Sequence, residues 1–171
     1  MEHADFSGDI SENGLLNQAD ILYKKGFLTE NEKNSLDILK LQEFFKSDLF
    51  KKIRSSKEIK REVMFAVKEK AKRLGIANSD SPILVQGVID LVLINDDEIT
   101  IIDYKTDKNL SPEDATQKYR VQLVCYNMAV EKLFGKKAKH AYIYLFDTGK
   151  TAFVSLDEAF LSERFDENKQ L

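Results

Sequence analysis

The sequence predicts an α/β sandwich: a central mixed β-sheet flanked by helices, with a helical part at the N-terminus. Three observations support this prediction. Residues 1–55 combine helical spacing of apolar residues with capping signals, the next third of the chain is rich in β-branched runs, and a helix-start signal at Ser111 precedes two more apolar strands. A chain of 171 residues is long enough for one domain with a sizeable core. We therefore expect a single domain over residues 1–171, with an α/β core over residues 56–165.

Two helices are predicted in the N-terminal part. Residues 12–25 place apolar side chains near helical spacing, and Gly26 is suited to end that helix. Thr29 followed by Glu32 forms a capping box, which predicts the start of a second helix. This second helix is expected to contain Leu36, Leu39, Leu41 and Phe44.

Three strands are predicted in the middle of the chain. Alternating valine and phenylalanine residues favour a strand over 59–69, although the flanking lysines and glutamates are good helix formers. Residues 83–94 and 98–105 are apolar, rich in β-branched residues, and separated by a short polar turn. These runs are therefore expected to be buried strands.

A long helix and two further strands complete the predicted sandwich. The run Ser111-Pro112-Glu113-Asp114 has a capping serine, a proline at the first helical position and acids in the first turn. The helix is expected to reach Phe134, where Gly135 ends it. Residues 140–147 and 151–156 are predicted to form a hairpin, followed by a short terminal helix.

Composition points to a protein of a reducing, cytoplasmic setting. No apolar run approaches the ~20 residues that span a bilayer, and Met1–Asp5 does not resemble the start of a signal peptide. The lone Cys125 can form neither an internal disulfide nor a cysteine metal site.

The distribution of charge suggests a nucleic-acid partner even though the net charge is only −3. Residues 46–73 carry 11 Lys and Arg residues against 4 acids. Clustered cations bind phosphates without regard to base sequence, so this basic segment is the candidate DNA-facing surface. The alternative for such a run is a solvated basic surface.

Two aspartates interrupt neighbouring predicted strands in the stretch QGVIDLVLINDDEITIIDYKTDK. If residues 95–98 form a tight turn, Ile94 faces Ile99 and Asp90 faces Asp103, because paired positions then sum to 193. Directly opposed residues have Cβ atoms about 4.5–5.5 Å apart. Lys105 lies on the same face as Asp103, since side chains repeat every second residue.

This arrangement suggests chemistry at the end of the strand pair. Two carboxylates about 4 Å apart repel by about 1 kcal/mol in water and about 4 kcal/mol at an effective dielectric of 20. A shared proton, the neighbouring Lys105 or a divalent cation could each relieve this repulsion. A cation such as Mg²⁺ would fit the oxygen ligands and, with Lys105, would indicate phosphodiester hydrolysis. The structural alternative is a salt-bridged cluster of Asp90, Asp103 and Lys105.

Three segments make the chain similar to a known family. They are VQGVIDLV (85–92), with a G-x-x-D element, IIDYKTD (101–107), with a D-x-K element, and YRVQLVCYNMAV (119–130), with a Q-x-x-x-Y element. Their order and spacing resemble the RecB-type nucleases of the PD-(D/E)XK superfamily, most closely the C-terminal nuclease domain of AddA-type helicase–nuclease subunits, which process double-strand DNA ends in bacteria.

The resemblance implies a restriction-endonuclease-like fold and a defined site. Asp90, Asp103 and the carbonyl of Tyr104 would hold Mg²⁺ or Mn²⁺, and Lys105 would be the catalytic lysine. Gln122 and Tyr126 would line the same site, which agrees with their i, i+4 spacing on one helix face. Glu62 resembles the acid of the family's E-x-x-F strand, with a surface ion pair as the alternative.

The resemblance also implies partners and a branch of the family. Relatives of the AddB type hold an iron–sulfur cluster on four cysteines, so the single cysteine excludes that branch. The family begins with a G-T-x-x-H helix, and Met1–Phe6 looks like the residues just after its histidine. The sequence thus resembles an excised domain whose partners are helicase domains of the parent chain and a second nuclease subunit. An inert DNA-binding scaffold of the same fold and a standalone nuclease are the alternatives.

Overall fold

A computed structural model describes residues 1–161 of the chain. The helices are α1 (Glu12–Lys24), α2 (Glu30–Asn34), α3 (Ile38–Lys46), α4 (Asp48–Arg54) and α5 (Pro112–Phe134). The strands are β1 (Glu58–Lys70), β2 (Pro82–Ile94), β3 (Ile99–Lys105), β4 (His140–Leu145) and β5 (Lys150–Phe153). This element order confirms the predicted α/β sandwich with a helical N-terminal part.

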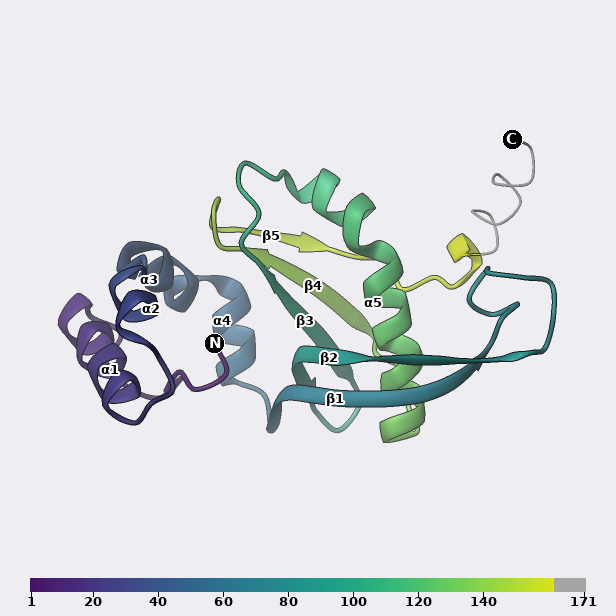
Figure 1. The fold of residues 1–171 in the computed structure, drawn as a ribbon, viewed down its shortest axis with the longest axis horizontal. Coiled ribbons are helices and arrows are strands. Elements are labelled where there is room, and N and C mark those ends of the chain that lie inside the picture. The colour runs from purple at the N-terminus through teal and green to yellow at the C-terminus, as the bar shows by residue number, and fades with distance from the viewer. Residues whose placement is uncertain (162–171) are drawn as a thin grey trace.

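The strands form one five-stranded mixed sheet in the order β1-β2-β3-β4-β5. Only the β3–β4 pair is parallel, because α5 provides the crossover between them; the other pairs are antiparallel. Helix α5 crosses one face of the sheet, while α1 to α4 gather at one end of the molecule (Figure 1). The long β1–β2 pair reaches away from that helical end as an arm.

The predicted second helix is wrong as a single element, because the structure divides it into α2 and α3. The Thr29–Glu32 capping box is present and starts α2, which is only five residues long. A new helix then begins where the side chain of Asp37 accepts a hydrogen bond from the backbone N–H of Lys40. Leu36 therefore lies between the two helices. An internal aspartate cap can end one helix and start another.

The sheet separates two apolar cores. On one face, α5 buries Leu123 and Val130 against residues of all five strands. On the other, α3 and α4 bury Phe44, Phe50 and Ile53 against β2, β3 and β4. Each helical layer thus covers one side of the central strands, as the predicted sandwich requires.

In both β1 and β2, the set of side chains that points toward α5 shifts by one residue at the same level of the sheet. Phe65 and Val67 pack in the core under α5, yet Ile59, which strict alternation would place beside them, packs in the opposite core. On β2, Ile89 and Leu91 are likewise divided between the two cores. In a regular strand, every second side chain points to the same face. We therefore infer that this alternation is interrupted in β1 and β2 at positions that lie opposite each other.

The change of face coincides with a gap in the strand ladder. Pairing runs from Arg61 opposite Leu91 directly to Val63 opposite Ile89, leaving Glu62 and Asp90 between them unpaired. Glu62 has φ +48°, a conformation that residues other than glycine seldom adopt. The irregularity therefore falls on two of the acids that the sequence singles out.

An ion cluster fastens the outer part of the arm to the rest of the domain. The Arg73 guanidinium lies 2.6 Å from Glu131 and 2.8 Å from Glu158, and 3.3 Å from the buried Glu69. Lys137 adds a second cation 2.7 Å from Glu158. Together these contacts join β1, α5 and the segment after β5.

We expect Glu158 to make stability depend on acid pH. Arg73 and Lys137 lower the pKa of Glu158 from 4.5 to about 2. Because the folded pKa is depressed, the stabilisation is fully present above pH 4.5 and is lost as pH falls towards 2. After allowance for partial exposure this amounts to about 1–2 kcal/mol. Urea unfolding of the wild type and Glu158→Gln should therefore differ at pH 7 and converge near pH 2; a constant difference would contradict the assignment.

The remaining predicted elements follow the sequence closely. Helix α5 has Ser111 as its cap and ends at Gly135, which has φ +69°. The β4–β5 hairpin and the strand at 59–69 are confirmed. The predicted terminal helix lies for the most part outside the described residues. Within residues 1–161, no helix is long and apolar enough to cross a membrane.

Candidate active site

Three acids occupy neighbouring positions on three adjacent strands. Glu62 on β1 lies opposite Asp90 on β2, in the gap of the ladder described above. The predicted β2–β3 register is confirmed for the four pairs from Ile94–Ile99 to Leu91–Ile102. The ladder ends there, so the pairing of Asp90 with Asp103 stays a prediction. Glu62 and Asp90 thus share the gap between β1 and β2, and Asp103 directly follows the last paired residue of β3.

The side chain of Asp90 accepts a hydrogen bond that a backbone carbonyl of β2 would accept in a regular ladder. Its Oδ2 accepts a hydrogen bond of 2.7 Å from the backbone N–H of Tyr104, one residue beyond Asp103. The ladder has stopped at this level, so the N–H would otherwise lack a strand partner. This bond fixes the Asp90 carboxylate beside β3.

Asp103 and Lys105 form a buried ion pair on the face under α5. The Lys105 Nζ lies 2.5 Å from Asp103 Oδ2, and the two side chains are 15% and 1% exposed. Burial raises the pKa of Asp103 to about 6 although Lys105 opposes the shift, and the neighbouring Asp90 raises it further. The pair thus combines a desolvated carboxylate, a fixed ammonium and a second nearby carboxylate.

Helix α5 brings Gln122 and Tyr126 to the same region. The Gln122 Nε2 donates a hydrogen bond of 2.7 Å to the Tyr126 hydroxyl. Burial raises the pKa of Tyr126 to about 12, with a further contribution from the charge of Asp103. The Tyr126 ring lies beside Phe65 of β1 and Gly87 of β2, the two strands that carry Glu62 and Asp90. Glu62 is exposed, and partial desolvation and Asp90 raise its pKa.

Gly87 of the G-x-x-D element leaves room for the ring that supports Tyr126. A Cβ at Gly87 would lie 3.1 Å from two ring atoms of Phe65 and 3.8 Å from Tyr126. Phe65 in turn meets Tyr126 edge-on, with ring centroids 5.7 Å apart. The glycine is explained by this close approach, since its φ is not positive.

We expect Gly87→Ala to destabilise the protein by about 1–2 kcal/mol because it overpacks the Phe65 ring. Urea unfolding would measure this loss. The matched variant Phe65→Leu removes the ring atoms that the new methyl group meets, so the double variant should show a smaller penalty than the sum of the two single changes. Additive losses would contradict the steric explanation.

The donors present are compatible with a hard divalent cation. Asp90 and Asp103 supply carboxylate oxygens, and Mg²⁺ typically binds one or two carboxylates while it keeps several waters. The described part of the chain contains no group of three or more His, Cys, Asp and Glu side chains arranged to hold a metal ion. Any cation at this site would therefore rely on the Asp90–Asp103 pair. Its further ligands would be waters and backbone oxygens such as the predicted Tyr104 carbonyl.

Sequence reasoning missed the roles of Tyr119 and Asp107. The Lys105 Nζ lies 4.4 Å from the centroid of the Tyr119 ring. The Tyr119 hydroxyl donates a hydrogen bond of 2.7 Å to Asp107. Tyr119 lies three residues before Gln122 on the same helix face, and Asp107 ends the DYKTD run. Their positions next to the two motifs could have indicated that both lie close to Lys105.

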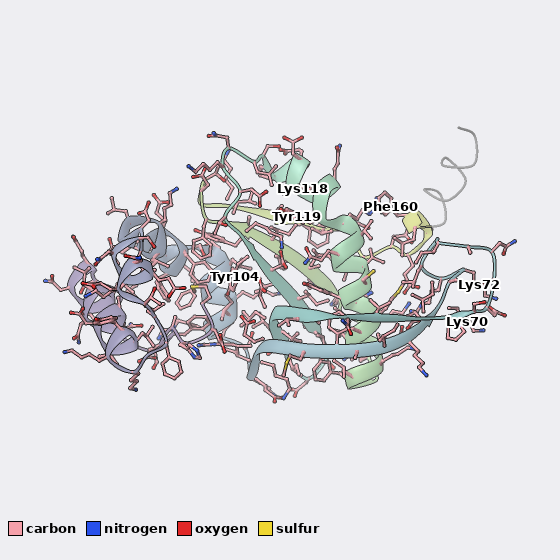
Figure 2. The ribbon with its side chains drawn as sticks, in the orientation of Figure 1. Lys70, Lys72, Tyr104, Lys118, Tyr119 and Phe160 are labelled. Atoms are coloured by element: carbon pink, nitrogen blue, oxygen red, sulfur yellow. The ribbon has the colours of Figure 1, made fainter. Side chains whose placement is uncertain are left out.

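The basic segment 46–73 does not form one surface. Lys70 and Lys72 lie at the arm tip, far from α4 (Figure 2). Most of its cations are engaged: several pair with nearby acids, and Arg61 donates to the carbonyls of Glu2 and Ala4. Lys46 and Arg54, at the helical end, are not among the ion pairs found within residues 1–161.

Comparison with known proteins agrees with this architecture. The family model of the PD-(D/E)XK nuclease superfamily matches residues 15–170. The A-type subunits of ATP-dependent helicase/nucleases are 37% identical over 155 residues in Thermoanaerobacter sp. (strain X514), 35% over 157 in Ruminiclostridium cellulolyticum and 30% over 158 in Listeria innocua. These matches cover 86–88% of this chain but only 12–13% of each relative.

A solved structure described as "Crystal structure of SSO0001" covers 96% of this chain and 72% of its own, with 16% identity and a TM-score of 0.44. The family match and the relatives suffice: the chain belongs to the PD-(D/E)XK nuclease superfamily.

Proposed function

We propose that this chain is the metal-dependent DNA nuclease domain of an ATP-dependent helicase–nuclease that processes double-strand DNA ends, cutting strands as an exonuclease. The single observation that carries this proposal is the buried Asp103–Lys105 pair beside Asp90. The relatives, which are named as helicase/nuclease subunits, support the helicase context. Because the chain spans 12–13% of their length, helicase domains would lie elsewhere in the parent chain.

The residues of the site would divide the work of phosphodiester hydrolysis. Asp90 and Asp103 would hold Mg²⁺ or Mn²⁺, which lowers the pKa of bound water and offsets charge on the phosphate. Lys105 would place its ammonium against the negative charge that develops on the phosphate oxygens. Gln122 fixes the Tyr126 hydroxyl, so both α5 residues would contact the DNA backbone or an ordered water there.

DNA would approach the site across the end of the sheet that adjoins the N-terminal helices. Phosphate contacts position a strand without reading its sequence. Of the basic segment, Lys46 and Arg54 are the candidates at this end for such contacts, whereas Lys70 and Lys72 already flank Asp80 at the arm tip. The DNA-facing part of segment 46–73 would therefore be its first residues, from Lys46 to Arg54.

Metal titration followed by a cleavage assay tests the proposal. We expect Mg²⁺ or Mn²⁺ to bind the wild-type chain by calorimetry and the chain to cut single-stranded DNA, and both properties to disappear in Asp103→Ala. Asp96→Asn, an exposed aspartate in the β2–β3 turn, is the matched control and should retain both. Metal binding without cleavage would favour the inert scaffold. Cation binding that survives Asp103→Ala would refute the assigned site.

A further inference from the structure

We propose that Tyr119 is a positioning residue: its ring holds the Lys105 ammonium in place, and Asp107 anchors the ring. This inference rests on the proposed function for its catalytic meaning, but its geometry stands apart from any bound metal. It assigns a task to two residues that lie outside the Asp90, Asp103, Lys105, Gln122 and Tyr126 set.

Lys105 is held between the sheet and α5. Its ammonium pairs with Asp103 on the same strand at 2.5 Å and lies 4.4 Å from the Tyr119 ring centroid. A lysine side chain is a flexible four-carbon stem that ends in a point charge, so a single ion pair leaves it several rotamers. A second contact from the helix restricts that freedom.

The ring suits this task because it attracts a cation without offering a ligand oxygen. At 15% exposure the Lys105 side chain is largely desolvated, the condition under which cation–π attraction is strongest. The ring also does not compete for the oxygens of Asp103. It can therefore keep the ammonium near the phosphate position when Asp103 is engaged elsewhere.

Asp107 fixes the ring from its far edge. Its Oδ2 accepts from the Tyr119 hydroxyl at 2.7 Å, and its Oδ1 accepts from Lys118 at 2.6 Å. Both bonds lower the pKa of Asp107, so it stays ionised and a strong acceptor at neutral pH. Lys118 and Tyr119 extend from the first half of α5 (Figure 2). The loop after β3 thus ties this helical turn to the strand that carries Lys105.

The first test reads the position of Lys105 by NMR and requires no activity. A nucleus above an aromatic ring is shifted upfield, and the Lys105 Hε–Cε signal can be assigned by its disappearance in Lys105→Met. We expect an upfield signal that moves to an ordinary position in Tyr119→Leu. In Tyr119→Phe, which keeps the ring but loses the bond to Asp107, the upfield shift should be reduced only in part. Tyr23→Leu is the matched control, since Lys33 lies 4.9 Å from the Tyr23 ring: it should move the Lys33 signal only.

The second test asks whether this position matters for cleavage. In single-turnover assays with Mg²⁺, Tyr119→Leu should slow cutting about tenfold, the fold-change expected for one desolvated cation–π contact. The affinity for DNA should be unchanged, and Tyr119→Phe should recover most of the rate. A loss of packing alone would slow cleavage without moving the Lys105 signal of the first test.

The outcomes separate the inference from the proposed function. An unmoved Lys105 signal in Tyr119→Leu overturns the inference, and so does a moved signal with an unchanged cleavage rate. If the wild type does not cut DNA at all, the proposed function fails while the NMR comparison still decides whether Tyr119 holds Lys105.

Discussion

Replacing Lys105 by methionine is expected to slow single-strand DNA cleavage by about 10²–10³-fold, the usual effect of removing one group that stabilises transition-state charge. Methionine keeps most of the length of the side chain and removes only the charge. The buried Asp103 carboxylate would lose its partner, which raises its pKa above the present value of about 6. The protein should remain folded because Asp103 can then take up a proton.

Lys33→Met is the matched control for this change. Lys33 also pairs with an aspartate, Asp20, at 3.0 Å and lies against a tyrosine ring, but on the N-terminal helices. Its replacement should leave the cleavage rate within a factor of about two, an effect below about 0.4 kcal/mol. Equal losses in the two variants, or an active Lys105→Met, would contradict the catalytic role proposed for Lys105. Circular dichroism and urea unfolding confirm that each variant is folded.

Replacing Phe44 by alanine is expected to reduce the free energy of unfolding by about 3–5 kcal/mol, the range for a large buried aromatic side chain. Phe44 is fully buried in α3. Its ring meets those of Phe50, Tyr104 and Tyr144 edge-on, with centroids 5.3, 5.5 and 4.8 Å away. It therefore joins the N-terminal helices to β3 and β4, and the cavity would weaken that junction.

Leu39→Ala provides the comparison within the same helix. Leu39 is 68% exposed, so its truncation should change stability by less than about 0.5 kcal/mol. Urea unfolding of both variants tests the prediction. A loss below about 1 kcal/mol in Phe44→Ala would mean that the helical layer contributes little to the stability of the sheet. The Tyr104 contact adds a functional readout, because loosening β3 here should also weaken the metal binding proposed for Asp90 and Asp103.

Local sequence determined most of the elements. The Ser111 cap and Gly135 stop bound α5 within one residue, since capping and left-handed termini depend on a few neighbouring side chains. The β2–β3 register followed from the short turn, which fixes pairing as far as Leu91–Ile102. The break between α2 and α3 was missed because the capping aspartate lies within a run that also satisfies helical spacing.

The irregularity at Glu62 and Asp90 could not be predicted from the sequence. A change of face should appear as a shift in the apolar alternation, but residues 91–94 are all apolar, so either face would look buried. Only the packing of α5 on one side and of the N-terminal helices on the other decides which residues enter each core. At this irregularity the Asp90 carboxylate accepts a hydrogen bond from the Tyr104 N–H.

For the candidate site, the spacing of residues along the chain was enough to place acids on adjacent strands and polar side chains on one face of α5. Tertiary structure alone decided that the Lys105 ammonium meets the Tyr119 ring and that the cations of segment 46–73 are spread along the molecule. The physical reason is the separation along the chain of the residues that interact. Caps, turns and strand pairing act over a few residues or across a short hairpin, whereas these contacts join parts of the chain whose approach depends on how two helical layers pack against one sheet.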